Sequence, residues 1–254
     1  MKTYHFNLEI TKKCNQKCFY CFNDSGYSKK RDEFSLAEWK NLITGITLKG
    51  NESVHITGGE PFLHPDIMEI LSHSINLGLK TSILSNGLNI SRLAQSFPEL
   101  FSKLVVAQIS LDSMNPELHN KRRGYANSFS DAMSAIAALI NLNVPVEVSS
   151  TVSDENINDL YEIGNFCKEN NLGLIVRPLL TAGRAVGVLL SDNFINKISN
   201  TVKDLKDMNI QVTEDRFQYV EAENKSSNIW DNEILTVHKD GVVRGSTTSI
   251  LNYF

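Results

Sequence analysis

The sequence predicts an α/β fold organised on a parallel sheet, and three observations support this prediction. Short apolar runs typical of strands recur along the chain, at about residues 4–10, 53–57, 80–84, 105–111, 145–151 and 173–178. Longer amphipathic segments typical of helices separate them, at about residues 35–48, 66–77, 89–102, 127–142 and 156–171. Polar residues follow each predicted strand, at the edge where α/β folds assemble their sites. Six such units give either an open doubly wound sheet or a partial barrel, and the pattern alone does not separate the two.

Local signals support these elements in order along the chain. Apolar and polar residues alternate over residues 6–10, as expected of a strand with two different faces. Ser35 and Glu38 form a capping-box pattern, which predicts that the first helix starts there. Gly78 and Gly87 stand at predicted turns, where the backbone needs dihedral angles that other residues disfavour.

The pattern changes after the sixth predicted strand. The sequence there predicts a helix at residues 191–207 and a short strand at residues 209–213. It also predicts a hairpin whose two strands lie at residues 233–237 and 242–244. The hairpin prediction depends on Asp240-Gly241, a strong signal for a tight turn between strands. We therefore expect two parts, an α/β unit over residues 1–190 and a short C-terminal extension over residues 191–254.

Composition limits the class of protein. The chain has 254 residues, 41% of them apolar and 21% charged, which is typical of a globular protein with a large core. A formal net charge of −4 argues against a nucleic-acid partner bound through phosphate contacts. No apolar run is long enough to cross a membrane or to form a signal peptide. Three of the four cysteines lie in one loop, so a disulfide framework is not expected, and we expect a reducing cytoplasmic location.

The three clustered cysteines are the most informative feature of the chain. Cys14, Cys18 and Cys21 lie in one short loop directly after the first predicted strand. A [4Fe–4S] cluster is normally held by four cysteine thiolates, so three leave one iron open to a non-protein ligand. A three-cysteine zinc site with a fourth ligand from elsewhere, or chance spacing, remains an alternative.

Two motifs together resemble those of the radical S-adenosylmethionine (radical SAM) superfamily. One is the CxxxCxxC loop with Tyr20 before its last cysteine, and the other is Gly58-Gly59-Glu60-Pro61 after the second predicted strand. The resemblance covers nearly the whole chain and implies a partial (β/α)6 barrel. It also implies that Cys14, Cys18 and Cys21 hold one [4Fe–4S] cluster, whose open iron is chelated by the amino and carboxylate groups of SAM.

The same resemblance implies an activity. A flavodoxin- or ferredoxin-type donor supplies one electron, SAM is cleaved to methionine and a 5′-deoxyadenosyl radical, and that radical takes a hydrogen atom from the substrate. The sequence assigns no catalytic side chain beyond those that hold the two cofactors.

Residues at the ends of the second to fourth predicted strands are candidate SAM contacts. Glu60 follows two glycines that let the backbone approach a ligand, and the resemblance implies that it orients the SAM amino group, whereas a plain strand-to-helix turn would leave it solvated. Ser110 and Asp112 are expected to face the barrel mouth together, because side chains alternate along a strand, and they suit a ribose diol. A strand-end turn is their alternative role. Ser85 and Asn86 are further candidates, although they could form only a turn.

The remaining candidate contacts come from later in the chain and from the cysteine loop. Arg123 resembles a residue of the superfamily's peptide-modifying members and suits the SAM carboxylate, since a guanidinium pairs well with that group. Ser150 and Arg177 end the fifth and sixth predicted strands, Leu179 resembles the stretch that passes near adenine, and Tyr20 would lie beside adenine. Solvation of the arginines and simple packing of Tyr20 are the alternatives.

The substrate is expected to be a peptide. The region from the fourth predicted strand to Ala185 resembles the branch that matures ribosomal peptides, whose members often carry a cysteine-rich C-terminal (SPASM) extension with auxiliary clusters. Gly245 and Ser246 stand where its first cysteine would lie, so we expect one cluster and a core role for the remaining Cys167. A nucleotide- or other small-molecule-modifying enzyme similar to viperin, or a catalytically silent binding module of the same fold, is the alternative.

Overall fold

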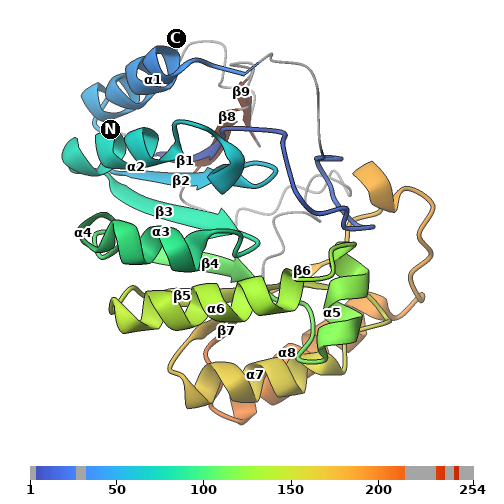
Figure 1. Cartoon of the computed structure of the whole chain (residues 1–254). Coiled ribbons are helices and arrows are strands. Elements are labelled where there is room, and N and C mark those ends of the chain that lie inside the picture. Colours follow the sequence, from blue (N-terminus) through green and yellow to red (C-terminus); the bar gives the residue numbers. More distant parts are fainter. Residues whose placement is uncertain (1–3, 27–32, 215–232, 238–242, 246–254) are drawn as a thin grey trace.

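The computed structural model describes residues 4–26, 33–214, 233–237 and 243–245. Its strands are β1 (Tyr4–Glu9), β2 (Ser53–Thr57), β3 (Lys80–Ser85), β4 (Val106–Ser110), β5 (Val146–Val152), β6 (Gly173–Pro178), β7 (Val212–Glu214), β8 (Glu233–Val237) and β9 (Val243–Gly245). They form one sheet in the order β7-β6-β5-β4-β3-β2-β1-β8-β9, in which every neighbouring pair is parallel except β8 and β9 (Figure 1). The six predicted parallel strands are therefore confirmed.

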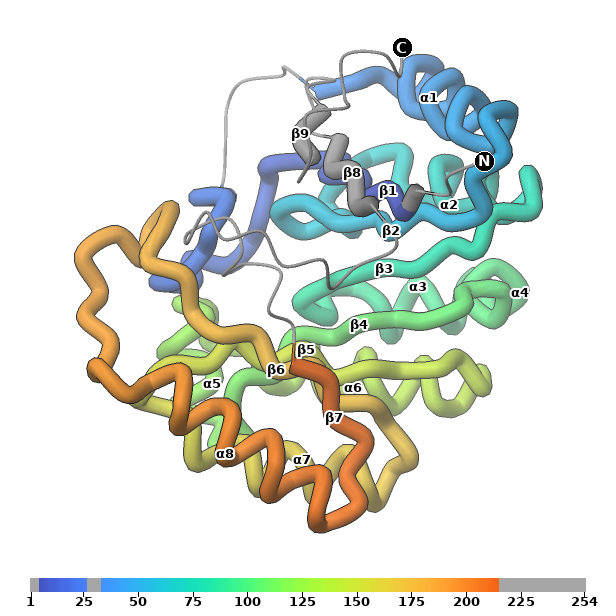
Figure 2. Tube along the Cα trace, turned by 180° about the vertical axis from the view of Figure 1, so that it is seen from behind, coloured from blue at the N-terminus to red at the C-terminus, as the bar shows by residue number. Residues whose placement is uncertain are grey.

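Helices cover one face of this sheet. They are α1 (Leu36–Leu48), α2 (Ile67–Asn76), α3 (Ile90–Ser96), α4 (Pro98–Phe101), α5 (Pro116–Arg123), α6 (Ser128–Asn141), α7 (Asp159–Glu169) and α8 (Phe194–Asp207), with the 3-10 turns η1 (Pro61–Leu63) and η2 (Gly183–Ala185). Helices α2, α3 and α6 lie in front of the strands in Figure 1, whereas the view from behind in Figure 2 looks onto the strands. Among the described strands, β7 and β9 end the sheet without pairing with each other, as in an incomplete barrel.

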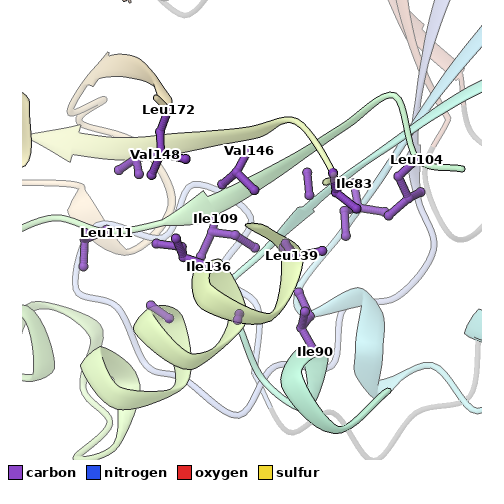
Figure 3. Packing of buried hydrophobic residues seen from close by; sticks show 14 of the residues in the cluster. Ile83, Ile90, Leu104, Ile109, Leu111, Ile136, Leu139, Val146, Val148 and Leu172 are labelled. Carbon is purple, nitrogen blue, oxygen red and sulfur yellow. The ribbon is translucent and has the colours of Figure 1, made fainter. Parts of the chain in front are cut away.

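Alternation within the strands separates an apolar face from a polar one. In β4, Ala107 and Ile109 are fully buried toward the helices, and Ile136 and Leu139 of α6 pack in the same core (Figure 3). The intervening Gln108 faces the other side of the sheet, where its amide donates to Glu147 of β5 at 2.9 Å. The apolar face thus holds the fold, and the polar face is left for a site.

Several predicted elements differ in detail. The helix expected over residues 89–102 is broken at Phe97 (φ −133°, ψ 53°), because Pro98 cannot continue a helix but can start the next one. The strand expected at residues 209–213 lies at Val212–Glu214 instead. The capping box of Ser35 and Glu38 is confirmed by hydrogen bonds in both directions.

The C-terminal hairpin is the largest difference from expectation. Its two strands pair antiparallel as predicted, with Leu235 opposite Gly245. However, β8 also pairs in parallel with β1, from Tyr4 opposite Glu233 to Leu8 opposite Val237. The hairpin therefore adds two strands to the sheet at the edge next to β1. The expected boundary near residue 190, between an α/β unit and a C-terminal extension, stays a prediction. Beyond it, β7 belongs to the same sheet as β1 to β6, and α8 packs against β6 and β7.

In the part of the chain that the structure describes, none of the helices combines the length and the apolar character that a membrane crossing requires.

The core contact between α6 and the sheet gives the first testable prediction. Leu139 is fully buried, so Leu139→Ala should lower the free energy of unfolding of the iron-free protein by about 2–5 kcal/mol through lost burial and a cavity. Leu48 of α1 is 82% exposed, and Leu48→Ala should change it by about 0.5 kcal/mol or less. Urea titration of both variants measures the difference; equal effects would contradict the packing described above.

Candidate functional site

A pocket opens at the carboxyl ends of the strands, where the cysteine loop (residues 11–26), α5 and the segment before α8 meet in both views (Figures 1 and 2). Eleven of the predicted site residues line it: Cys14, Cys18, Tyr20, Cys21, Gly58, Gly59, Ser85, Asn86, Ser110, Arg123 and Arg177. Sequence reasoning missed nine other lining residues: Gln16, Phe22, Ser25, Thr57, Leu84, Ser149, Thr151, Leu180 and Arg184. Four predicted residues lie outside the lining, namely Glu60, Asp112, Ser150 and Leu179.

The three thiols share this pocket, and two of them accept backbone N–H groups. The amide of Gln16 donates to Cys14 Sγ at 3.4 Å, and the amide of Ser25 donates to Cys21 Sγ at 3.3 Å. Burial raises the pKa of the Cys14 thiol to about 12 and also raises the pKa of Cys18. A bound metal must therefore displace these protons, and the N–H donors help to stabilise the resulting thiolates.

Three thiols on one cavity match the three protein ligands of a cluster with an open iron. The thiols of Cys14, Cys18 and Cys21 line a cavity that is shared with the turn after β2. Within the described residues, no group of three His, Cys, Asp or Glu side chains closes on one metal ion.

Gly58 and Gly59 are required by close contact with the cysteine loop. A Cβ atom on Gly59 would lie 2.3 Å from the carbonyl oxygen of Lys13, and one on Gly58 would lie 2.5 Å from that of Thr11. The Gly59 amide donates to the Thr11 carbonyl at 2.6 Å, and the Glu60 amide to the Lys13 carbonyl at 2.7 Å. The glycines therefore serve the approach of two backbone segments, in addition to any ligand that they meet.

Glu60 lies behind this turn, fully buried. Its carboxylate accepts hydrogen bonds from the Ser85 hydroxyl at 2.8 Å, the Asn86 amide at 2.8 Å and the Phe62 amide at 3.2 Å. Burial raises the pKa of Glu60 to about 7, although these donors favour the charged form. Its side chain fixes Ser85 and Asn86, which line the pocket, so Glu60 is placed to act through them.

The expectation that Asp112 faces the mouth beside Ser110 is wrong. β4 ends at Ser110, so strand alternation no longer applies two residues later, and Asp112 turns into the protein interior. Its carboxylate accepts from Arg123 Nη2 at 3.0 Å and from the Thr151 amide at 2.9 Å, and the Tyr20 hydroxyl also donates to it. Burial alone would raise the pKa of Asp112, but Arg123 and Arg122 hold it below its ordinary value.

Arg123 joins this buried cluster to the pocket. Its Nε lies 2.9 Å from Asp112 Oδ2, and its guanidinium carbon lies 5.5 Å from the centre of the Tyr20 ring. Burial alone would lower the pKa of Arg123, but the Asp112 carboxylate raises it, so the side chain stays charged where it lines the pocket. Asp112 is therefore a positioning residue for Arg123 and Tyr20.

Helix α5, which carries Arg123, was not predicted from the sequence. The available signal was Asn115-Pro116, because the Asn115 side chain accepts from the amides of Glu117 and Leu118 and Pro116 occupies the first helical turn. The last turn of α5 holds the cysteine loop, since the Lys17 amide donates to the Arg123 carbonyl at 3.0 Å.

A neutral histidine links α5 to the cysteine loop. His119 Nδ1 accepts from the Asp112 amide at 3.1 Å, so its Nε2 carries the proton toward Ser128 Oγ at 2.9 Å. Burial and the nearby Arg123 lower the pKa of His119 to about 4, which keeps the ring neutral. Ser128 Oγ also accepts from the side-chain amide of Gln16 at 2.9 Å, which fixes this residue between two of the cysteines.

The end of β5 presents different hydroxyls from the one predicted. Ser149 and Thr151 line the pocket, whereas Ser150 faces the opposite side of the strand and is fully buried. The alternation of Val146, Val148 and Val152 gives the phase of the strand and places Ser150 on their face, so the sequence held the signal for this difference. Ser149 also accepts a hydrogen bond of 2.5 Å from Arg177, whose other amino group donates to Gln108 at 2.9 Å.

After β6 the chain returns to the cysteine loop. Leu179 is buried against Cys18, Tyr20 and Ala185, so the next residue, Leu180, lines the pocket in its place. Leu179 lies outside the pocket lining because the strand ends at Pro178, and its place near adenine stays a prediction.

Comparison with known proteins identifies the family. The sequence model of the Radical SAM superfamily matches residues 8–167, which include all three clustered cysteines and the Gly58-Gly59-Glu60 turn. The chain belongs to the radical SAM superfamily. This confirms the predicted fold and the predicted cofactor pair, SAM and one [4Fe–4S] site.

Relatives with different names match this radical SAM chain about equally well. An S-adenosylmethionine-dependent nucleotide dehydratase of Selenomonas ruminantium is 29% identical over 170 residues, 63% of this chain and 61% of its own. The antilisterial bacteriocin subtilosin biosynthesis protein AlbA of Bacillus subtilis is 28% identical over 169 residues, 66% of this chain and 37% of its own. The chain thus spans less than two thirds of the length of either relative.

A solved structure agrees on the fold. Streptococcus suis SuiB, in a crystal structure with the precursor peptide SuiA, superposes with a TM-score of 0.76 over 95% of this chain and 59% of that chain, at 15% sequence identity. Because it covers 95% of this chain, the likeness extends past the family match at residue 167.

Iron content tests the three-thiol site. Cys18→Ala should lose nearly all iron after reconstitution, because two thiolates do not hold a cubane, whereas the wild type should hold about four irons per chain. Cys167→Ala is the matched control, since Cys167 is fully buried in α7 and away from the pocket lining. Full iron retention in Cys18→Ala, or about eight irons in the wild type, would contradict a single cluster on these cysteines.

The pKa of Glu60 predicts a pH-dependent stability. Its folded pKa of about 7 lies above the ordinary value of 4.5, so between these values the folded state binds a proton that the unfolded chain has released. Relative to Glu60→Gln, the free energy of unfolding of the iron-free wild type should therefore fall as pH rises through this window, by at most roughly 3 kcal/mol.

Comparison with the variant is needed because His119 acts in the opposite sense. Its folded pKa of about 4 lies below the ordinary value of 6.5, so it makes stability rise over much of the same window in both proteins. Glu99→Gln removes a charge at an exposed position of α4 and should reproduce the wild-type profile. Parallel profiles for the wild type and Glu60→Gln would show that Glu60 does not titrate in this range.

Proposed function

We propose that this radical SAM enzyme abstracts a hydrogen atom from a peptide substrate in the maturation of a ribosomal peptide. The observation that carries the proposal is a set of exposed apolar side chains on two segments that meet at the pocket, the cysteine loop and the segment that follows η2. Phe22 of the cysteine loop lines the pocket and is 52% exposed, and Val186 and Leu189 after η2 are 73% and 93% exposed; these three residues are called the apolar rim. Exposed apolar side chains on segments beside a pocket suit the side chains of a docked peptide.

The lining also suits a peptide better than a nucleotide. Each of its three arginines already has protein partners: Arg123 has Asp112, Arg177 has Ser149 and Gln108, and Arg184 has backbone carbonyls. A nucleoside triphosphate needs several cations for its phosphates. With Arg123 proposed for the SAM carboxylate, only Arg177 and Arg184 of the lining would be left for these phosphates, and both donate to protein groups. The names of AlbA and of SuiB bound to its precursor peptide agree with a peptide substrate.

In the proposed reaction the cofactors supply the chemistry and the chain supplies their placement. When bound, the cluster and SAM generate a 5′-deoxyadenosyl radical by reductive cleavage of SAM. Cys14, Cys18 and Cys21 would hold the cluster, and the Gly58-Gly59 turn with Ser85 and Asn86, both fixed by Glu60, would meet the SAM amino group.

Other lining residues would hold the rest of SAM. Arg123, kept charged and oriented by Asp112, is proposed for the carboxylate. Ser110 is proposed for the ribose, together with Thr151 in place of the buried Ser150, and Tyr20 for adenine. Arg177 is proposed to remain a positioning residue that fixes Ser149.

The electron is proposed to come from a flavodoxin- or ferredoxin-type donor, as in the superfamily, and the protein is proposed to act in the cytoplasm. The net charge of −4 leaves no reason to propose a nucleic-acid partner. Modification of a nucleotide remains the second candidate, because the nucleotide dehydratase of Selenomonas ruminantium matches as well as the peptide-related relatives do.

Deuterium transfer tests the substrate class. The reduced, reconstituted enzyme is incubated without oxygen with SAM and either a pool of perdeuterated peptides or perdeuterated nucleoside triphosphates. Deuterium in 5′-deoxyadenosine should come from the peptides alone, and transfer from a nucleotide alone would overturn the proposal.

The apolar rim adds a matched pair of variants. Phe22→Ser should raise the KM for the peptide that transfers deuterium by several-fold while substrate-free SAM cleavage is kept. Phe97→Ser alters an aromatic side chain that is 46% exposed outside the pocket lining, and it should leave both values unchanged. Equal KM values in the two variants would show that the Phe22 side chain does not contribute to peptide binding.

A further inference from the structure

The turn η2 makes an unusual set of contacts with the cysteine loop. It lies after β6 and beyond residue 167, where the superfamily match ends. The amide of Arg184 donates to the Cys21 carbonyl at 3.0 Å. This contact places the backbone of η2 against the backbone of a cluster ligand, far from it in the sequence.

The Arg184 side chain continues the contact across the loop. Its Nε donates to the Cys18 carbonyl at 2.8 Å, 166 residues earlier in the chain. One of its amino groups donates to the Ser25 carbonyl at 2.6 Å and to the Asp24 carboxylate at 3.1 Å. One guanidinium thus fixes both ends of the segment that carries Cys18 and Cys21, with the rigid fork geometry that lysine lacks.

Gly183 brings the two backbones close enough for these bonds. Its φ is +58°, and a Cβ atom there would lie 2.3 Å from the carbonyl oxygens of both Cys21 and Phe22. A side chain at this position would therefore push η2 away from the loop. Gly187 has a φ of +87° in the same segment, but a Cβ atom there would meet nothing within 4 Å.

The loop backbone is otherwise held from different sides. The Gly58-Gly59 turn contacts residues that precede Cys14, and the end of α5 accepts from the Lys17 and Phe19 amides through the Arg123 and Arg122 carbonyls. Arg184 and Gly183 contact the stretch that follows Cys18, and the loop itself forms neither helix nor strand there.

We propose that the Gly183-Arg184 pair is a positioning element for the iron–sulfur cluster. It holds the backbone of Cys18 and Cys21 in the folded iron-free chain, so that their thiols converge with that of Cys14 before iron is bound. Arg184 touches the cluster loop through carbonyl groups, so its role is placement of ligands. The inference concerns the cysteine loop and holds for either class of substrate.

Cysteine alkylation in the iron-free protein tests this placement without turnover. Arg184→Gln is compared with Arg92→Gln, a change at an exposed arginine of α3. Iodoacetamide labelling is followed at each cysteine by mass spectrometry, and Cys167 in the core serves as the internal reference. Arg184→Gln should label several-fold faster at Cys18 and Cys21, with Cys167 unchanged, whereas Arg92→Gln should match the wild type.

Iron retention gives the second measurement. After reconstitution, Arg184→Gln and Gly183→Ala should lose iron to a chelator several-fold faster than the wild type. Gly187→Ala carries the same positive-φ strain without the contact and should retain iron as the wild type does. Arg184→Lys should lose iron at an intermediate rate, because lysine keeps the positive charge but lacks the forked guanidinium group.

Two outcomes would overturn the proposal. One is iron loss and labelling in Arg184→Gln equal to those of Arg92→Gln. The other is labelling of Cys167 that rises together with that of Cys18, which would show that Arg184 supports the fold as a whole. If Gly183→Ala fails to fold, Arg184→Gln alone still tests the proposal. The Arg184 side chain is 25% exposed, so its replacement leaves the core intact.

Discussion

The backbone N–H and carbonyl groups of the cysteine loop need partners from other parts of the chain, because residues 11–26 form neither a helix nor a strand. The partners come from three places that are distant in sequence: the turn after β2, the end of α5 and η2. At each place a glycine lies against the loop backbone, namely Gly59, Gly124 and Gly183. A Cβ atom at any of them would come within 2.7 Å of a loop carbonyl oxygen. The architecture of the pocket depends on these close approaches.

Charge is arranged around the same loop. Three thiolates and the buried carboxylate of Asp112 would place strong negative charge in a small volume, and removing a charged group from water without a partner is costly. Arg123 of α5 pairs with Asp112, and Arg184 of η2 donates to the Cys18 carbonyl. Both arginines therefore combine a structural contact with a positive charge that acts on the Cys18 thiol.

Much of this could be predicted from the sequence, for identifiable reasons. Alternating apolar runs indicated six parallel strands, because strand periodicity is a local property. The cysteine spacing indicated the cluster, because its ligands lie in one loop. Residues at strand ends were harder to place: Asp112 was assigned a direction by alternation, although β4 had already ended at Ser110. Ser150 was also misplaced, although the alternation of Val146, Val148 and Val152 puts it on the apolar face of β5.

Contacts between segments that are distant in the chain could not be predicted from the local sequence. Nothing near Arg184 in the sequence shows that its partners lie at Cys18 and Ser25. The pairing of β8 with β1 was hidden for the same reason, since a short apolar run is compatible with either edge of a sheet.

The position of β1 has a consequence for how the protein is made. This strand precedes every other described strand in the chain, yet it lies between β2 and β8 and reaches its second parallel neighbour only with residues 233–237. The cysteine loop that follows it likewise depends on Arg184, 166 residues after Cys18. Such long-range closures are slow relative to local ones. The ribosome must therefore release the chain beyond Arg184 before the cysteine loop has all these partners, and a shorter nascent chain offers its three thiols without them.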